Sequence, residues 1–216
     1  MNFTFGIITN DNDANINIIA ESIRNLDIPN YEIIVVGKCG IQADDIRVLS
    51  FDETIISKLI TKKKNMITDA ATYENVVYLH DYITFDKNWY NGFLKYGNDF
   101  NICMNNIVDA RDKRFRDWVV EYKGEVRLIP YEVTDLSKFI YFSGAYWVAK
   151  KEFMLKYPLN EKLSWGQGED CEWSYRVREV TDFKVNSYST VKFLKQKQNK
   201  TITATAQDIK EMRKQL

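Results

Sequence analysis

The opening of the chain alternates between two kinds of pattern, and this alternation constrains the fold more than any other feature. Residues 3–9 are an apolar run rich in β-branched and aromatic side chains, which predicts a buried strand. Residues 14–26 carry large aliphatic side chains at spacings of three and four, which predicts a helix with one buried face. Residues 32–37 form a second continuous apolar run. Strand, helix and strand in this order predict a βαβ unit with parallel strands.

The rest of the chain extends this pattern and then changes it. Short strands are expected at residues 47–51 and 75–79, with a helix over 56–71 between them. Later segments predict a hairpin (118–122 and 125–129), strand-like runs (138–149) and helices (151–156, 169–178 and 206–216). We therefore expect an α/β fold with a mixed, mostly parallel sheet flanked by helices, in a single domain over residues 1–216.

Composition excludes several classes of partner. The 216 residues contain 30 lysines and arginines against 30 aspartates and glutamates, so no overall positive field attracts nucleic acid or an anionic membrane. The sequence lacks a run of about 18 apolar residues, so no membrane span is expected. Cys39, Cys103 and Cys171 are too far apart in sequence for a zinc motif. A cytoplasmic protein with free thiols is the expectation.

His80 and Asp81 directly follow the apolar strand expected at 75–79. Ligands of open α/β sheets bind beyond the carboxyl ends of the strands, where such groups can hold a divalent cation on a diphosphate. The alternative is that both residues only cap the next turn.

Residues 163–172 contain a tryptophan, two glycines and then acidic residues that open a helix. The amino end of a helix stabilises ionised carboxylates, which suits a general base. The alternative interpretation is an acidic cap without a chemical role. A third feature, the lysine run 62–64 followed by Asn65, is either a solvated helix end or a set of point charges that face a diphosphate.

Taken in order, these segments resemble the GT-A glycosyltransferases, in particular the family 2-like and galactosyltransferase-like inverting enzymes. The resemblance spans nearly the whole chain and is carried by residues 6–9, 31–37, 64–65, 78–81, 144–145 and 165–170. Its most specific part is the tryptophan-glycine-x-glycine-glutamate-aspartate segment at 165–170. The resemblance implies a nucleotide-sugar-binding half (1–104) and an acceptor-binding half (105–216).

The resemblance also implies roles for residues around the donor. The residues implied to border or contact the nucleotide are Thr9, Asn10, Gly37, Asp52, Lys64, Asn65, His80 and Asp81. The segment 80–82 stands where the family carries its Asp-x-Asp metal motif, and here Tyr82 or Leu79 replaces one of the aspartates. Asp81 is then the favoured ligand, with His80 beside it, for Mn²⁺ or Mg²⁺.

On the acceptor side, the resemblance makes Asp170 the catalytic base and Glu169 the residue that orients the acceptor. Gly144 and Trp165 are expected to border the acceptor, although Trp165 can equally fill the core. The implied reaction moves a hexose, with inversion, from a nucleoside-diphosphate sugar to a hydroxyl of a glycan acceptor. A UDP-sugar is the expected donor.

Two other functional classes remain open. The altered segment 80–82 also fits a catalytically weak protein that only binds a sugar nucleotide. A nucleotidyltransferase or another Rossmann-like enzyme is less well supported, because the chain has neither GxGxxG after the first strand nor GxxxxGK[ST] anywhere.

Overall fold

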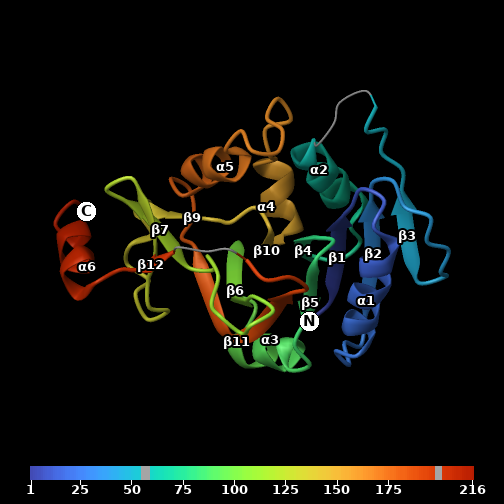
Figure 1. Cartoon of the computed structure of the whole chain (residues 1–216), viewed down its shortest axis with the longest axis horizontal. Coiled ribbons are helices and arrows are strands. Elements are labelled where there is room, and N and C mark those ends of the chain that lie inside the picture. Colours follow the sequence, from blue (N-terminus) through green and yellow to red (C-terminus); the bar gives the residue numbers. More distant parts are fainter. Residues whose placement is uncertain (55–58, 198–200) are drawn as a thin grey trace.

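A computed structural model describes residues 1–54, 59–197 and 201–216. Within these residues, eight strands form one large sheet in the order β3-β2-β1-β4-β10-β6-β11-β5 (Figure 1). These strands are β1 (Phe3–Ile8), β2 (Tyr31–Val36), β3 (Ile46–Leu49), β4 (Asn75–His80), β5 (Ile83–Phe85), β6 (Ile102–Val108), β10 (Tyr146–Lys150) and β11 (Lys184–Phe193). The sheet is mixed and flanked by helices, which confirms the expected fold class.

The amino-terminal part of the sheet is the predicted βαβ arrangement. β1 pairs in parallel with both β2 and β4, and β2 pairs in parallel with β3. Helix α1 (Asp13–Arg24) connects β1 to β2, and α2 (Ile60–Ala70) precedes β4. The expected helix over 56–71 is confirmed from residue 60 onward, whereas residues 56–58 lie outside the described part of the chain.

The remaining part of the sheet is less regular. β10 runs antiparallel to both β4 and β6, β11 is parallel to β6, and β5 closes the edge antiparallel to β11. The sequence patterns do not predict β6, β11 or helix α3 (Trp89–Tyr96). Polar residues interrupt both strands, and a register shift between Asn186 and Thr190 further disguises β11.

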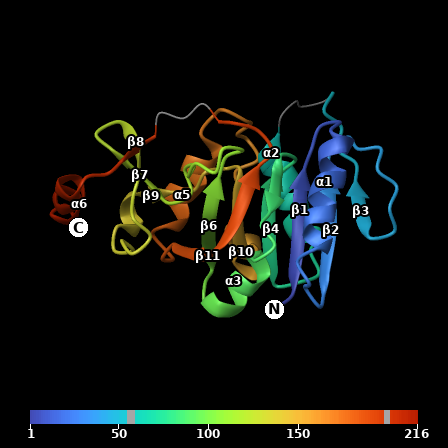
Figure 2. The ribbon, with the colours of Figure 1, turned by 60° about the horizontal axis from the view of Figure 1, so that its bottom comes forward.

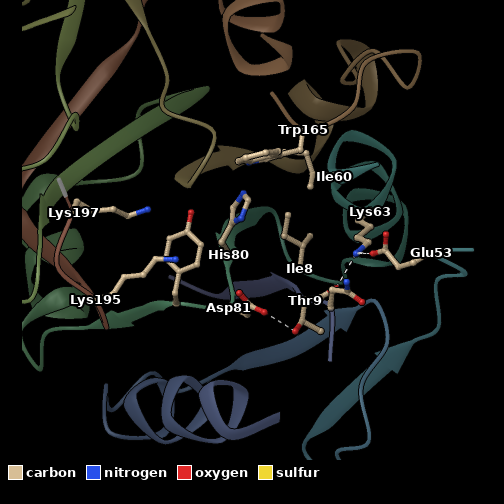
Figure 3. A pocket seen from close by; sticks show the side chains of 12 residues that line it. Ile8, Thr9, Glu53, Ile60, Lys63, His80, Asp81, Trp165, Lys195 and Lys197 are labelled. Atoms are coloured by element: carbon tan, nitrogen blue, oxygen red, sulfur yellow. Dashed lines mark hydrogen bonds and ion pairs between the residues drawn. The ribbon is translucent and has the colours of Figure 1, made fainter. Parts of the chain in front are cut away.

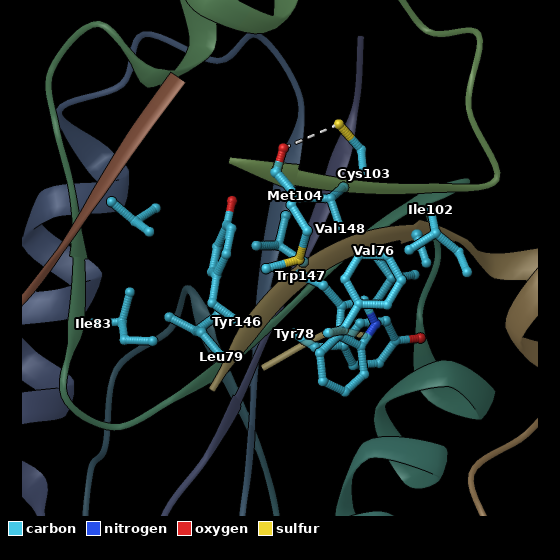
Figure 4. Packing of buried hydrophobic residues seen from close by; sticks show 14 of the residues in the cluster. Val76, Tyr78, Leu79, Ile83, Ile102, Cys103, Met104, Tyr146, Trp147 and Val148 are labelled. Atoms are coloured by element: carbon cyan, nitrogen blue, oxygen red, sulfur yellow. Dashed lines mark hydrogen bonds between the residues drawn. The ribbon is translucent and has the colours of Figure 1, made fainter. Parts of the chain in front are cut away.

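Helices cover both faces of the large sheet (Figure 1). α2 packs on β1 and β2, while α4 (Lys151–Lys156) packs on β10 and against α2. On the other face α3 packs on β11, and its Trp89 ring lies 5.0 Å from the Phe3 ring of β1. Between β4 and β10, the rings of Tyr78 and Trp147 stack at 5.2 Å within the buried core (Figure 4). Both faces of β1 are therefore buried, which is why nearly all of its residues are apolar; the exception, Thr4, donates a hydrogen bond to Glu32.

A second, four-stranded sheet lies beyond the β6 and β11 side of the molecule (Figure 2). Its strands are β7 (Val119–Tyr122), β8 (Glu125–Leu128), β9 (Ile140–Tyr141) and β12 (Ile202–Thr203). β7 and β8 form the predicted antiparallel hairpin. Helices α5 (Glu169–Val177) and α6 (Ala206–Arg213) follow the predicted segments, and a short 3-10 helix spans Ser137–Phe139. No helix of the described residues is long and apolar enough to cross a membrane.

Candidate functional site

The carboxyl ends of β1 and β4 meet because the two strands are parallel neighbours. Ile8 is in register with His80, and the residues that follow them converge. The Thr9 hydroxyl donates a 2.8 Å hydrogen bond to the Asp81 carboxylate, and the Asn15 amide donates a 2.8 Å bond to the Asp81 carbonyl. The strand-end interpretation therefore locates a polar site, with Asp81 fixed from two sides.

A cavity of about 420 Å³ opens at these strand ends (Figure 3). It is lined by Ile8, Thr9, Asn10, Glu53, Ile60, Lys63, His80, Asp81, Tyr82, Trp165, Lys195 and Lys197. We call it the donor cavity, after the ligand expected there from the sequence. Its lining combines apolar side chains with two carboxylates, an imidazole and three amines, a composition typical of sites for small charged ligands.

Lys63 reaches the donor cavity from α2. Its ammonium group donates a 2.8 Å hydrogen bond to the Thr9 carbonyl and forms an ion pair with Glu53. Successive residues of a helix point about 100° apart, so the lysine run diverges: Lys62 is exposed, whereas Lys64 is buried. Lys63 is thus the member of the run that lines the cavity.

Lys195 and Lys197 enter the donor cavity from the opposite side (Figure 3). Their ammonium nitrogens lie 4.2 Å and 4.4 Å from the centre of the Tyr82 ring. Burial, followed by the nearby Lys195 and Arg116, lowers the pKa of Lys197. The sequence predicts no role for these two lysines, because no local pattern in a segment after a strand indicates which way its side chains face.

A second cavity of about 170 Å³ adjoins the first. Its lining comprises Ile60, His80, Tyr82, Phe115, Arg116, Ser143, Gly144, Ala145, Trp165, Glu169, Asp170 and Lys197. We call it the acceptor cavity, after the ligand expected there from the sequence. Ile60, His80, Tyr82, Trp165 and Lys197 line both cavities. The two cavities are therefore parts of one cleft, with Asp81 on one side of it and Asp170 on the other.

Asp170 lies in the first turn of α5, with its carboxylate fixed by backbone donors. One oxygen accepts a 2.8 Å hydrogen bond from the Gly144 amide, and the other accepts a 2.9 Å bond from the Cys171 amide. The amino end of the helix adds a favourable field for a negative charge. Asp170 is thus oriented as an ionised group that lines the acceptor cavity.

Lys64 lies beneath this carboxylate. Its ammonium group donates to the Gly144 carbonyl and lies 4.2 Å from the centre of the Trp147 ring. Burial lowers the pKa of Lys64 to about 8, although Asp170 and Glu169 act in the opposite direction. Burial also raises the pKa of Glu169, with a further contribution from the charge of Asp170. The buried cation thus supports the acidic pair electrostatically from below.

His80 is held in its neutral form. Burial and the charges of Lys64 and Lys197 keep the pKa of His80 well below its usual range, against a hydrogen bond with the Gly144 backbone. Its backbone amide also donates to the Ala145 carbonyl at 3.1 Å. A neutral imidazole beside a ligand can bind a metal or accept a hydrogen bond, but it adds no positive charge.

The structure brings together most of the residues expected from the sequence. Thr9, Asn10, His80 and Asp81 line the donor cavity, and Gly144, Glu169 and Asp170 line the acceptor cavity. Trp165 lines both. Because 60% of its surface is exposed, the alternative that Trp165 fills the core is wrong.

Four residues expected at the nucleotide do not line either cavity. Lys64 is buried beneath the cleft, and Asn65 instead binds the backbone of Leu159 through both ends of its amide. Asp52 accepts hydrogen bonds from Thr54, and its neighbour Glu53 lines the donor cavity instead. Gly37 acts indirectly: with φ at +140°, it lets the chain pass so close to the Thr9 carbonyl that a Cβ atom would overlap it.

The side chains of the donor cavity do not make up a set of ligands for Mn²⁺ or Mg²⁺. Among the residues described, no group of three or more histidine, cysteine, aspartate or glutamate side chains converges on one point. Octahedral cations need about six ligands, mostly oxygens, and here Asp81 also accepts a bond from Thr9. Tyr82 does not supply a negatively charged ligand, because burial raises the pKa of its phenol to about 12. The ammonium groups of Lys195 and Lys197 also lie over its ring.

Comparison with known proteins identifies the fold. No family model and no curated protein matches the sequence. A crystal structure of GalNAc-T7 with UDP, GalNAc and Mn²⁺ matches 99% of this chain with a TM-score of 0.68 and 11% identity. The chain has the GT-A fold.

Two crystal structures of S. aureus TarS share this GT-A arrangement. TarS 1–349 matches 88% of this chain with a TM-score of 0.58, and a longer TarS matches 98% with a TM-score of 0.61, both at 12% identity. The chain spans 48% of GalNAc-T7 and 60% and 38% of the two TarS chains. The GT-A fold is thus shared at low sequence identity, and the three structures extend beyond the part that matches.

Proposed function

We propose that the chain is an inverting glycosyltransferase that moves a hexose from a nucleoside-diphosphate sugar, UDP-linked in the first instance, to a hydroxyl of a glycan acceptor. The observation that carries the proposal is the continuous cleft, in which the donor and acceptor cavities share five lining residues. The GT-A fold and the UDP bound in the GalNAc-T7 structure support a sugar-nucleotide donor. One domain over residues 1–216 forms both parts of the cleft in this proposal.

The residues of the cleft suit a single displacement. The acceptor hydroxyl lies in the acceptor cavity, and Asp170 takes its proton as the oxygen attacks the anomeric carbon. The bond from that carbon to the diphosphate breaks, and its electron pair leaves with the nucleoside diphosphate. Attack opposite the leaving group inverts the anomeric centre. Trp165, exposed at the junction of the cavities, stacks on a sugar face, and Glu169 orients the acceptor.

The test is to replace the base without changing the shape of the site. Asp170→Asn keeps the size of the side chain and an oxygen that can accept the Gly144 hydrogen bond, but it cannot take a proton. We expect transfer from a panel of UDP- and GDP-sugars to fall by about 10²-fold or more, while UDP binding stays unchanged. Product release in the presence and absence of Mn²⁺ is the measurement.

Glu172→Gln is the matched control, because Glu172 lies on the same helix and pairs with Arg176. Full transfer by Asp170→Asn would remove the assigned base. The second candidate function, binding without transfer, is favoured by Tyr82 at the metal-motif position. It predicts that the wild-type protein binds a UDP-sugar but yields neither transfer nor donor hydrolysis.

A further inference from the structure

The three lysines of the donor cavity differ in what neutralises them. Glu53 pairs with Lys63, so this lysine brings little net charge. Lys195 and Lys197 take part in none of the ion pairs found among the described residues, and their ammonium groups face aromatic rings. Lys197 lies 4.7 Å from the centre of the Phe193 ring as well as beside Tyr82. The rings hold the two cations in place but leave their charge uncompensated.

Repulsion among these cations indicates that the cleft is built for an anion. Arg116 lines the adjoining acceptor cavity; burial is the main cause that lowers the pKa of Lys197, and the charges of Lys195 and Arg116 lower it further. Gathering like charges costs free energy unless a ligand of opposite charge binds among them. Two carboxylates line the donor cavity: Glu53 pairs with Lys63, and Asp81 accepts a hydrogen bond from Thr9, on the side of Asp81 away from the two lysines (Figure 3).

We propose that Lys195 and Lys197 bind the diphosphate of the donor and take the place of a divalent cation. The inference rests on the proposed function. In the transfer step the carbon–oxygen bond of the donor breaks, and the departing diphosphate oxygen gains the electron pair. Two ammonium groups already placed at the cavity stabilise that charge, as fixed cations do at other sites of phosphate departure.

The ligand set favours this assignment over a bound cation. A divalent ion beside Asp81 would have His80 as a second ligand, and it would lie in the same cavity as two ammonium groups that form no ion pair within the described residues. Those ammonium groups repel a second cation as strongly as they attract a diphosphate. The GalNAc-T7 structure contains Mn²⁺ together with UDP. The alternative that the test must distinguish is therefore a diphosphate site that requires a divalent cation.

The test measures nucleoside-diphosphate affinity by calorimetry in EDTA and then in Mn²⁺ or Mg²⁺. The probes are UDP and uridine, with GDP, CDP and ADP as further diphosphates. We expect wild-type protein to bind UDP in EDTA, and added Mn²⁺ to change that affinity by less than about threefold. Lys195→Met with Lys197→Met weakens UDP binding by about 100-fold, about tenfold for each charge, and leaves uridine binding unchanged.

Lys192→Met is the matched control, because Lys192 belongs to β11 and pairs with Asp112 outside both cavities. UDP binding that appears only with Mn²⁺ or Mg²⁺ overturns the inference and leaves the proposed function intact. UDP binding in EDTA that survives in the double variant also overturns it. If none of the diphosphates binds under any of these conditions, both the inference and the proposed function fail.

Discussion

Lys64 is not among the residues that line either cavity, yet its ammonium group acts electrostatically on the acceptor side. It donates to the Gly144 carbonyl, while the Gly144 amide donates to Asp170. One residue of backbone thus connects a buried cation to the proposed base. Burying an ammonium group is costly, and here two carboxylates and an aromatic ring offset part of that cost.

Replacing Lys64 tests this cost through its pH dependence. The pKa of Lys64 is about 8 in the folded protein, against about 10.4 for lysine in an unfolded chain. Because the folded value is lower, the unfolded state binds more protons between these values, and the free energy of unfolding rises with pH across this window. We expect the difference between wild type and Lys64→Met to grow by about 3 kcal/mol from about pH 7.5 to about pH 10.5.

Urea unfolding of both proteins at several pH values measures this difference. Other groups that titrate in the same range are common to both proteins and cancel. A difference that stays constant across the window would contradict the assignment of a charged, buried Lys64.

The site residues differ in whether the local sequence predicts them. Asp81 and Asp170 are predictable because a strand end and a glycine-rich acidic segment are local signals. Lys195 and Lys197 are not, because their position depends on the pairing of β11 with β6 and β5, which carry no clear alternation. The lysine run is an intermediate case: a helix is predictable there, but which lysine faces the cavity depends on how α2 is rotated on the sheet.

Among the elements, the close packing of α2 on β1 determines where Lys63 and Lys64 point. Gly6 of β1 lies under Ile67 of α2, and a Cβ atom on Gly6 would overlap the Ile67 side chain. A larger residue at position 6 must therefore push the helix away from the sheet. The helix carries one lysine toward each part of the cleft, so its distance from β1 is also a property of the site.

We expect Gly6→Ala to lower the free energy of unfolding by about 1–3 kcal/mol through overpacking. Ile67→Ala alone also destabilises the protein, because it leaves a cavity in the core. In the double variant the two losses should be less than additive, since the shortened side chain makes room for the new methyl group. A double-mutant cycle by urea denaturation measures the coupling, and strictly additive losses would contradict this packing.

Elements with strong periodicity are the ones that the sequence predicts. The βαβ start, the hairpin of β7 and β8 and the helices α4 and α5 are all confirmed. β6 and β11 escape prediction because polar side chains such as Asn105 and Asn186 are buried in them: the Asn105 amide donates across the sheet to the Asn186 carbonyl, and the Asn186 side chain bonds with Tyr188 and Ser189 of its own strand. Hydrogen bonds that satisfy a buried side-chain amide leave no pattern in the local sequence.

For the whole molecule, a ligand that spans the cleft should stabilise the fold. UDP at about 100 times its dissociation constant adds about 2.7 kcal/mol to the free energy of unfolding. For a chain of 216 residues this corresponds to a rise in melting temperature of about 5–10 °C. A thermal-shift assay with uridine at the same concentration as the control measures it. No rise with any nucleoside diphosphate would contradict the proposed donor site.

The donor cavity is built from distant parts of the sequence: Thr9 follows β1, whereas Lys195 and Lys197 follow β11. During synthesis, β1, α1 and β4 are therefore complete long before Lys195 and Lys197, the basic side of the cleft, have been added. A fragment that stops before β11 has Thr9, Lys63 and Asp81 but lacks both lysines of the basic side, so the proposed diphosphate site depends on contacts between distant parts of the sequence.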